Sequence, residues 1–335
     1  MQAAIYHGPG HGIGIDSVPD PRPKNNELLI EIARCGICGS DVSMTSGSCH
    51  DYPAGYCFGH EFSGTVVELG RDVGGWNVGD RVCCMPKAGC GRCEACRAGQ
   101  LFFCRDGTRS GGGFAELATV HAQAAIRIPD SVSFADGALV EPMACGLRAM
   151  RSANVSTGQR VLVLGAGSMA LASIWWAREL GAASVVALSR SGHRAGVCGM
   201  FGADGLVTFG DGTPDAIFDL LGGRPDVVSE CVGKPGMLAL ALDHLKPGGT
   251  VVSLGMSMAQ EGVMPGQLTL KEARLTFPLG YSPAEFTETA QTIEARGFKP
   301  DVMVSDVVPL AELASSIDRI RGGARTLKVQ VDPRG

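Results

Sequence analysis

An apolar stretch that is interrupted by a glycine-rich turn constrains the fold of this chain more than any other segment. Residues 161–164 read VLVL, GAGSMA follows at 165–170, and the sequence stays apolar to about residue 177. A buried strand that runs through G-x-G-x-x-A into a helix is the context that a dinucleotide-binding turn requires. The stretch is shorter than the ~20 residues of a membrane helix. We therefore expect a strand, a turn and a buried helix.

The segments after this turn continue as an alternation of apolar strand-like and helix-like runs. Further strands are predicted at 185–188, 226–230 and 250–254. Helices are predicted at 169–180, 194–201 and 236–245. A regular β, α, β, α order implies a parallel sheet with helices on both faces, which is the doubly wound Rossmann arrangement.

The sequence before and after this alternating region has a different pattern of apolar residues. Up to about residue 141, short apolar runs such as 28–32 and 63–70 are separated by Gly and Pro, which is typical of β-strands and loops. After residue 276, shorter elements end in a predicted strand at 326–331. We expect an α/β chain in which a Rossmann domain is inserted into a mainly β domain. The expected bounds are 1–146, 147–276 and 277–335.

Length and charge narrow the class of protein. A chain of 335 residues is long enough for two cores, so two domains are expected. The net charge is −5 and no basic run is present, which disfavours nucleic acid and anionic membranes as partners. The N-terminus MQAAIYHG lacks the basic and apolar regions of a secretion signal, so a cytoplasmic protein is expected.

The 13 cysteines fit a reducing compartment, because an odd number disfavours a complete set of disulfides. Some have the spacing of metal ligands, as described below. Others lack motif support and are expected to be buried small side chains: Cys35, Cys83, Cys84, Cys145, Cys198 and Cys231.

Four cysteines form the most specific metal motif. Cys90, Cys93, Cys96 and Cys104 have the spacing C-x2-C-x2-C-x7-C within one glycine-containing loop. This spacing suits tetrahedral zinc, and four protein ligands leave no open position for chemistry. The predicted zinc is therefore structural. Ordinary thiols or two disulfides are the alternative.

The glycine-rich turn predicts how a dinucleotide is held. Gly165 would form the tight turn, and Gly167 would let the backbone approach a pyrophosphate. The phosphates would lie at the helix N-terminus, near the N–H groups of Ser168 and Met169, where the helix dipole favours anions. A purely structural turn is the alternative.

The end of the second predicted strand indicates which dinucleotide is preferred. A carboxylate there would bind a ribose 2′-hydroxyl and repel a 2′-phosphate, but this chain has Ser189 and Arg190, with Arg194 one turn further on. A hydroxyl and guanidinium groups suit a phosphate, so NADP is favoured over NAD. Alternatively, the two arginines are solvated and Ser189 holds the ribose.

A second, weaker metal motif lies nearer the N-terminus. Cys38 in CGICGSD and His60 in GHEFSG offer a thiolate and an imidazole, and Glu141 in VEPMAC is a candidate third ligand. Three protein ligands and one exchangeable position make an open zinc site. Spacing alone does not select this set, because Cys35, Cys49 and Cys57 compete.

These motifs together resemble the zinc-dependent medium-chain dehydrogenase/reductase family, and most closely its bacterial sorbitol and threonine dehydrogenase-like branch. The resemblance covers essentially the whole chain in order: GICGSD at 36–41, GHE at 59–61, GDRV at 79–82, the four-cysteine loop, EP at 141–142, the glycine-rich turn and KPGG at 246–249. It implies a GroES-like catalytic domain with a structural-zinc lobe at about 86–106. It also implies a homodimer or homotetramer that associates through the nucleotide domain.

The resemblance assigns roles to residues that spacing left open. It implies that Cys38, His60 and Glu141 bind the catalytic zinc, with Glu61 as a carboxylate that can exchange onto the metal. Asp41 would orient the His60 imidazole. The resemblance also assigns the four cysteines to the structural zinc, and Lys328 to a basic position that approaches the cofactor.

The expected reaction is reversible oxidation of a secondary alcohol or polyol to a ketone or aldehyde, with hydride passing to the nicotinamide. Zinc would act as a Lewis acid on the substrate oxygen, and Ser40 would take the alcohol proton. Many relatives have a histidine three residues later, but this chain has Ser43, so water, the cofactor ribose or His50 would complete the relay. The alternatives are a noncatalytic NADPH-binding regulator on the same scaffold and a thiol-rich storage or redox-sensor protein.

Overall fold

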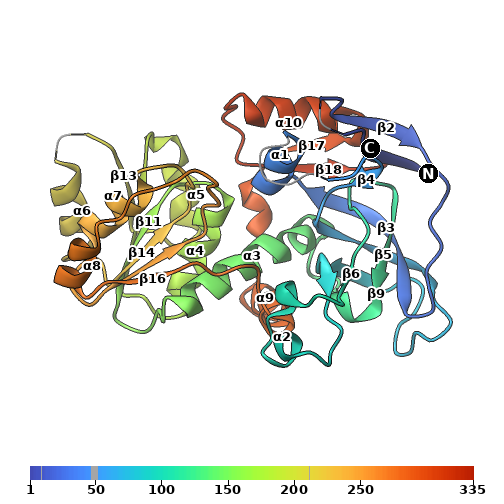
Figure 1. Cartoon of the computed structure of the whole chain (residues 1–335), viewed down its shortest axis with the longest axis horizontal. Coiled ribbons are helices and arrows are strands. Elements are labelled where there is room, and N and C mark those ends of the chain that lie inside the picture. Colours follow the sequence, from blue (N-terminus) through green and yellow to red (C-terminus); the bar gives the residue numbers. More distant parts are fainter. Residues whose placement is uncertain (9, 47–51, 211) are drawn as a thin grey trace. The chain divides into compact units, whose positions relative to one another are not determined.

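The computed structural model describes residues 1–8, 10–46, 52–210 and 212–335. The chain divides into two compact units, one formed by Met1–Glu141 with Ser282–Gly335 and the other by Pro142–Tyr281. The first division falls within helix α3 (Phe134–Ser152), which has Pro142 in its interior. In Figure 1 the second unit is coloured from green to orange.

The second unit is built on a six-stranded parallel sheet with the order β13-β12-β11-β14-β15-β16. The strands are β11 (Arg160–Leu164), β12 (Ser184–Ser189), β13 (Gly205–Thr208), β14 (Val227–Glu230), β15 (Thr250–Ser253) and β16 (Arg274–Thr276). The order reverses between β11 and β14. In such sheets the ligand crevice lies at that switch point, outside the carboxyl ends of the strands.

Helices lie on both sides of this sheet (Figure 1). They are α4 (Ser168–Glu179), α5 (Ala195–Met200), α6 (Thr213–Leu221), α7 (Met237–His244) and α8 (Pro265–Lys271), with the short 3-10 turn η3 (Gly192–Arg194) before α5. Leucine and valine side chains from the strands pack on α6 and α7, where Ile217, Leu221 and Leu242 are buried. Burial of these apolar faces stabilises the layers.

The first unit is mainly β. Its largest sheet has the order β10-β6-β5-β3-β18-β17, with β9 also paired to β3; a second sheet has the order β2-β1-β4, and β7 pairs with β8. The strands are β1 (Gln2–Tyr6), β2 (Ile13–Ser17), β3 (Glu27–Gly36), β4 (Tyr56–Cys57), β5 (Glu61–Leu69), β6 (Arg81–Cys84), β7 (Lys87–Ala88), β8 (Thr108–Arg109), β9 (Leu117–His121), β10 (Ala125–Arg127), β17 (Val304–Pro309) and β18 (Lys328–Asp332).

Helices and 3-10 turns complete the first unit. They are α1 (Gly39–Thr45), α2 (Glu94–Arg97), η1 (Leu101–Phe103), η2 (Ala122–Ala124), α9 (Pro283–Arg296), η4 (Pro300–Met303), η5 (Leu310–Glu312) and α10 (Leu313–Arg321). Helix α9 shows how the local sequence sets an element boundary. Ser282 Oγ accepts from the N–H of Glu285 at 3.2 Å, and the Glu285 side chain accepts from the N–H of Ser282 at 2.8 Å, which forms a capping box.

The predicted fold class is confirmed: a Rossmann sheet is inserted into a mainly β domain. The sequence patterns missed β13, α6, α8 and β16, which are short or partly polar. Four of the cysteines expected in the interior are buried, whereas Cys145 and Cys231 are half-buried. The exact domain bounds stay a prediction.

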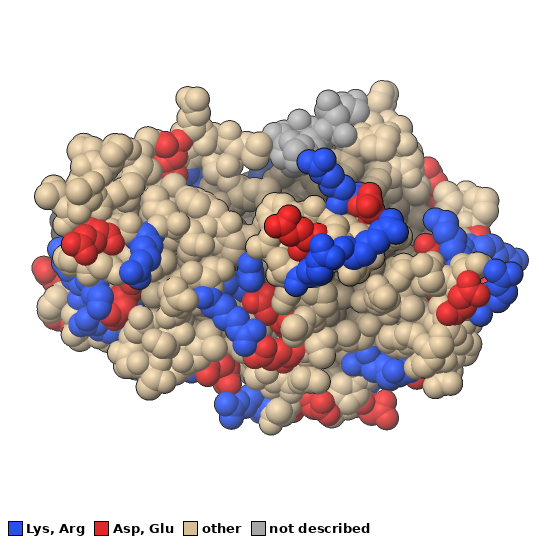
Figure 2. Space-filling view, turned by 60° about the horizontal axis from the view of Figure 1, so that its bottom comes forward, with Lys and Arg blue, Asp and Glu red and all other residues tan. Residues whose placement is uncertain are grey.

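The surface in Figure 2 carries acidic and basic side chains interspersed among uncharged ones. No continuous basic field covers the face in view. Among the described residues, no helix combines the length and apolar character needed to cross a membrane.

Candidate metal centres and cofactor site

Three metal-ligating side chains converge in the first unit. Cys38 lies between β3 and α1, His60 directly precedes β5, and Glu61 is the first residue of β5. Antiparallel pairing of β3 with β5 places Gly36 opposite Glu61, which brings these segments together. The ligand atoms of Cys38, His60 and Glu61 all lie within 4.8 Å of one another. Zinc–ligand bonds of about 2.0–2.3 Å separate tetrahedral ligands by roughly 3.3–3.8 Å, so small adjustments close this set around zinc.

Asp41 contacts two of these candidate ligands, Cys38 and His60. Its Oδ2 accepts from the backbone N–H of Cys38 at 2.9 Å, and its Oδ1 lies 3.4 Å from Nδ1 of His60. Asp41 is completely buried, and its Oδ1 meets the criteria for a hydrogen bond with no group in the described part of the chain. Because Nδ1 faces this carboxylate, Nε2 is the imidazole nitrogen available to a metal. Burial disfavours the imidazolium, but Asp41 outweighs this effect and raises the pKa of His60 well above its usual value.

Lys328 forms a buried ion pair with Glu61, the third residue of this group. Its Nζ donates to Oε1 and Oε2 of Glu61 at 2.9 and 2.7 Å, and to the carbonyl oxygen of Ile37 at 3.1 Å. Burial opposes the ammonium, but Glu61 and other nearby acidic groups raise the pKa of Lys328. The family resemblance implied only a role near the cofactor for Lys328, and that role stays a prediction. The pairing with Glu61 spans 267 positions, so no local pattern could reveal it.

Three of the remaining residues predicted for this site, Glu141, Ser40 and Ser43, lie in the described part of the chain. Glu141 is buried and close enough to influence Lys328 electrostatically, but it is not part of the three-residue set. Its assignment as a ligand stays a prediction. Ser40 is half-buried in the first turn of α1. Ser43 is exposed, and its Oγ donates to the carbonyl oxygen of Gly39 at 3.1 Å. His50 lies outside the described residues, as does Cys49.

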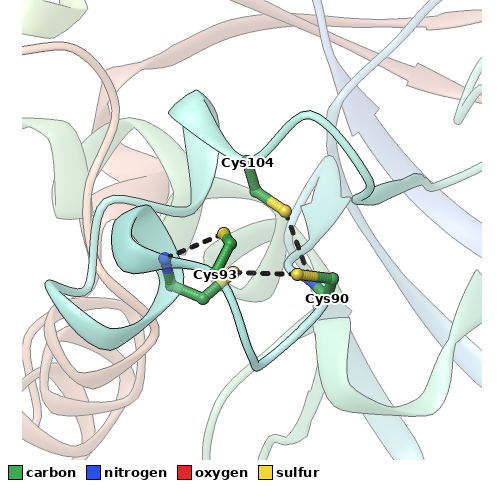
Figure 3. Close-up of side chains that lie close together, drawn as sticks. Cys90, Cys93 and Cys104 are labelled. Atoms are coloured by element: carbon green, nitrogen blue, oxygen red, sulfur yellow. Dashed lines mark hydrogen bonds between the residues drawn. The ribbon is translucent and has the colours of Figure 1, made fainter.

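The four motif cysteines form a second group in the first unit, and Figure 3 labels Cys90, Cys93 and Cys104. The sulfurs of Cys90, Cys93, Cys96 and Cys104 all lie within 4.8 Å of one another. The N–H of Cys90 donates to Sγ of Cys104 at 3.3 Å, and the N–H of Cys96 donates to Sγ of Cys93 at 3.4 Å. Sγ of Cys90 lies 4.0 Å from Sγ of Cys96. Backbone N–H groups directed at sulfur favour thiolates, the form that binds zinc.

The thiols of this loop differ in acidity. Hydrogen bonds from the backbone near Arg92 and Cys93 lower the pKa of Cys90 to about 6. Burial raises the pKa of Cys96 to about 11. Four sulfurs that lie this close together fit a structural zinc, which takes four protein ligands.

The second unit contains the glycine-rich turn at the predicted place. Gly165 follows β11 with φ +116°, a conformation that disfavours any side chain. Gly167 precedes α4, and a Cβ added there would meet no atom within 4 Å, so the backbone is open to an approaching group. No side chain caps the start of α4, which leaves its first N–H groups to an anion. These features fit a dinucleotide pyrophosphate.

The predicted 2′-phosphate residues follow β12. Ser189 is half-buried at the end of the strand and Arg190 is exposed. Nη1 of Arg194 donates to the carbonyl oxygen of Ala166 at 3.1 Å, and burial lowers the pKa of Arg194. Arg194 therefore ties the η3 segment to the glycine-rich turn. Contact of these side chains with a phosphate stays a prediction.

Two family models match the chain in succession. Residues 24–130 match the alcohol dehydrogenase GroES-like domain. Residues 167–295 match the zinc-binding dehydrogenase domain. The first range lies within the first unit, and most of the second range lies within the second unit.

Curated relatives extend this match. Sorbitol dehydrogenase from Ovis aries is 34% identical over 271 residues, which are 77% of this chain and 76% of the relative. Sorbitol dehydrogenase from Homo sapiens is 32% identical over 265 residues, which are 75% of this chain and 74% of the relative.

Solved structures resemble the whole chain. A zinc-binding dehydrogenase from Sinorhizobium meliloti 1021 bound to NADP has a TM-score of 0.90 at 31% identity, and the match covers 99% of each chain. The 2R,3R-butanediol dehydrogenase of Bacillus subtilis has a TM-score of 0.88 at 28% identity, also over 99% of each chain. The family models, the relatives and the solved structures are all dehydrogenases, which agrees with the two groups of zinc ligands described above. The chain belongs to the zinc-dependent medium-chain dehydrogenase/reductase family.

Proposed function

We propose that this protein is a zinc-dependent dehydrogenase that transfers hydride between NADP(H) and a secondary alcohol or polyol, or the matching ketone or aldehyde. The observation that carries the proposal is the convergence of Cys38, His60 and Glu61 in a chain that also contains a dinucleotide-type turn. A thiolate, an imidazole and a carboxylate are the donors of an open zinc site. Because three potential ligands converge and the relatives are dehydrogenases, nothing favours the noncatalytic alternative.

The side chains around the zinc site have separable roles. Bound zinc supplies a Lewis acid and NADP supplies the hydride acceptor. Asp41 holds the His60 ring so that Nε2 faces the ligand group. Ser40 lies two residues after Cys38, and its Oγ would take the proton of the substrate hydroxyl. Lys328 holds Glu61 by both oxygens and so sets how far this carboxylate extends toward the other ligands.

The substrate class follows from the relatives. They include sorbitol dehydrogenases and a butanediol dehydrogenase, which are named for alcohols with neighbouring hydroxyl groups. We therefore propose a polyol or another secondary alcohol as the substrate. We propose NADP as the preferred cofactor, because Ser189 and Arg190 follow β12 and the Sinorhizobium meliloti structure is bound to NADP.

Metal analysis and turnover on the same preparation test the proposal. We expect about two zinc ions per chain, one per ligand group. We also expect NADPH oxidation with ketones, and NADP⁺ reduction with sorbitol or 2,3-butanediol. One zinc per chain without turnover on any alcohol or carbonyl would contradict the enzymatic proposal.

Assembly and location complete the proposal. We propose a homodimer or homotetramer that associates through the second unit. There β16 lies at the edge of the sheet, and Leu270 and Phe277 are 87% and 62% exposed. Light scattering on Phe277→Asp, compared with the wild type, tests this surface. We propose the cytoplasm as the location, because the 12 cysteines in the described part of the chain form no disulfide bonds.

A further inference from the structure

A buried carboxylate outside both metal groups lies at the switch point of the Rossmann sheet. Glu230 ends β14, the strand beside β11 where the strand order reverses. Its side chain is only 2% exposed. The carboxylate accepts three hydrogen bonds, and all three donors are uncharged. Burial of a carboxylate is energetically unfavourable unless hydrogen bonds compensate for the lost water. The three hydrogen bonds of Glu230 therefore indicate a specific role for this side chain.

The three hydrogen bonds join two loops. Oε1 of Glu230 accepts from the N–H groups of Val232 and Gly233 at 2.6 and 2.8 Å, in the loop after β14. Oε2 accepts from Oγ of Ser253 at 2.9 Å, at the end of β15. The backbone carbonyl of Glu230 also accepts from the N–H of Gly255 at 3.1 Å. One residue therefore connects the loops at the carboxyl ends of two neighbouring strands.

The two loops are in close backbone contact. A Cβ placed on Gly255 would lie 2.1 Å from the backbone nitrogen of Gly233 and 2.4 Å from Oε2 of Glu230. Such a contact is impossible without movement of a loop, so only glycine fits position 255 in this arrangement. Gly233 itself has φ +65°. The Glu230 hydrogen bonds and these two glycines therefore specify one arrangement of the loops.

The same arrangement reaches the glycine-rich turn. The N–H of Cys231 donates to the carbonyl oxygen of Leu164 at 3.0 Å, which joins the loop after β14 to the end of β11. A Cβ placed on Gly165 would lie 3.4 Å from Cγ2 of Val232, so Val232 packs directly beside the turn. Val232 is nevertheless 40% exposed. It presents an aliphatic side chain at the crevice where doubly wound sheets bind dinucleotides.

We propose that Glu230 is a positioning residue for the dinucleotide, because its carboxylate holds the loop 231–233 against the loop 253–255 and so places Val232 beside the Gly165 turn. This inference rests on the proposed NADP(H) binding. Glu230 itself need not touch the cofactor. Without the Glu230 carboxylate, Val232 and Gly233 lose the acceptor for their N–H groups. The loop that forms this wall of the crevice is then no longer held in one position.

Titration of the full-length protein with NADPH, followed by nicotinamide fluorescence, tests the proposal. We expect Glu230→Ala to raise the NADPH dissociation constant by about tenfold, a factor that corresponds to about 1.4 kcal/mol. Glu230→Gln is expected to restore most of the affinity. Its amide oxygen can accept from the same two N–H groups, and its amide nitrogen can donate to Ser253. Steady-state kinetics should show a larger change in the KM for NADPH than in kcat.

Two further variants separate positioning from general stability. Gly255→Ala forces the same two loops apart from the other side, so it should weaken NADPH binding as Glu230→Ala does, even if Glu230→Ala does not fold. Asp226→Asn is the matched control. Asp226 immediately precedes the same strand at its opposite end, where it pairs with Arg160 and Lys246. It should lower the unfolding temperature without changing the dissociation constant.

The outcomes are distinguishable. The inference is overturned if folded Glu230→Ala or Gly255→Ala binds NADPH as tightly as the wild type. It is also overturned if affinity merely follows the unfolding temperature across all variants, Asp226→Asn included. A wild-type protein that does not bind NADPH would instead contradict the cofactor in the proposed function, and with it this inference.

Discussion

Two buried side chains that bind no metal in our assignment determine the geometry of the candidate catalytic centre. Asp41 contacts both the Cys38 backbone and the His60 ring, and Lys328 holds Glu61 by both carboxylate oxygens. Removing one partner of a buried ion pair typically costs about 3–5 kcal/mol because the remaining charge is uncompensated. At the scale of single residues, the site therefore depends on contacts that support the ligands as much as on the ligands themselves.

Ser40 is expected to carry the first proton transfer. Loss of a general acid–base group slows turnover by roughly 10²–10⁴-fold, so Ser40→Ala should lower kcat by a factor in this range in a stopped-flow or steady-state assay. Ser43→Ala is the control, since Ser43 is exposed and its Oγ donates within its own helix. His50→Ala should also have little effect. Damage from His50→Ala as severe as that from Ser40→Ala would mean that the proton leaves through His50.

Arg190 is expected to select the cofactor. A hydrogen bond to a charged group contributes roughly 1.5–3 kcal/mol, so Arg190→Ala should raise the KM for NADPH at least about tenfold. The KM for NADH should change little, since NADH lacks the 2′-phosphate. Arg224→Ala is a suitable control because Arg224 donates to the carbonyl oxygen of Asp243, at the end of α7. An equal rise in both KM values for Arg190→Ala would argue against phosphate recognition.

At the scale of elements, the four-cysteine loop and the Rossmann strands are stabilised in different ways. The loop contains only the short helix α2 and the short turn η1, so its sulfur ligands replace the core that it lacks. The strands β11, β12, β14 and β15 instead bury nearly all of their central side chains. Metal loss should therefore affect the loop and not the parallel sheet.

Cys93→Ser tests the role of the loop. Because three ligands remain where four are needed, we expect one zinc per chain to be lost and the unfolding temperature to fall. Turnover per remaining folded molecule should change much less. Metal analysis and thermal unfolding check this expectation, with Cys145→Ser as a control outside both ligand groups. Loss of both zinc ions in Cys93→Ser would show that the two groups are not independent.

Asp226 is expected to make the Rossmann sheet sensitive to acid. Burial opposes its ionisation, but Lys246 and Arg160 outweigh this effect and hold the pKa of Asp226 below its ordinary value. The stabilisation is therefore fully present above about pH 4, and it is lost as the pH falls through the lower folded pKa. Denaturant unfolding should show a constant stability difference between wild type and Asp226→Asn from pH 7 to pH 5. The difference should shrink below about pH 4. A difference that already shrinks between pH 7 and pH 5 would contradict this assignment.

At the scale of the whole molecule, the two kinds of binding site lie in different compact units. Both ligand groups are in the first unit, and the glycine-rich turn is in the second. Metal and dinucleotide binding are thus assigned to different hydrophobic cores. Local damage to one unit need not remove the binding function of the other.

Chelation tests this separation. Treatment with a strong zinc chelator should abolish turnover, because the open site loses its metal. NADPH fluorescence titration of the same sample should still detect binding by the second unit. Re-addition of zinc should restore activity if the first unit remains folded. Loss of NADPH binding in step with zinc loss would show that the units depend on each other.

The sequence by itself determined the elements and residues whose signals are local. Buried strands, the glycine-rich turn and the C-x2-C-x2-C-x7-C loop are each encoded within about 20 residues, and the structure contains all three. The family resemblance added the pairing of Cys38 with His60. Only the tertiary structure decided which distant side chains meet: Lys328 with Glu61 across 267 positions, and Glu230 with Ser253 between neighbouring loops. These contacts depend on strand order and register, which bring remote segments together and leave no periodic trace in the sequence.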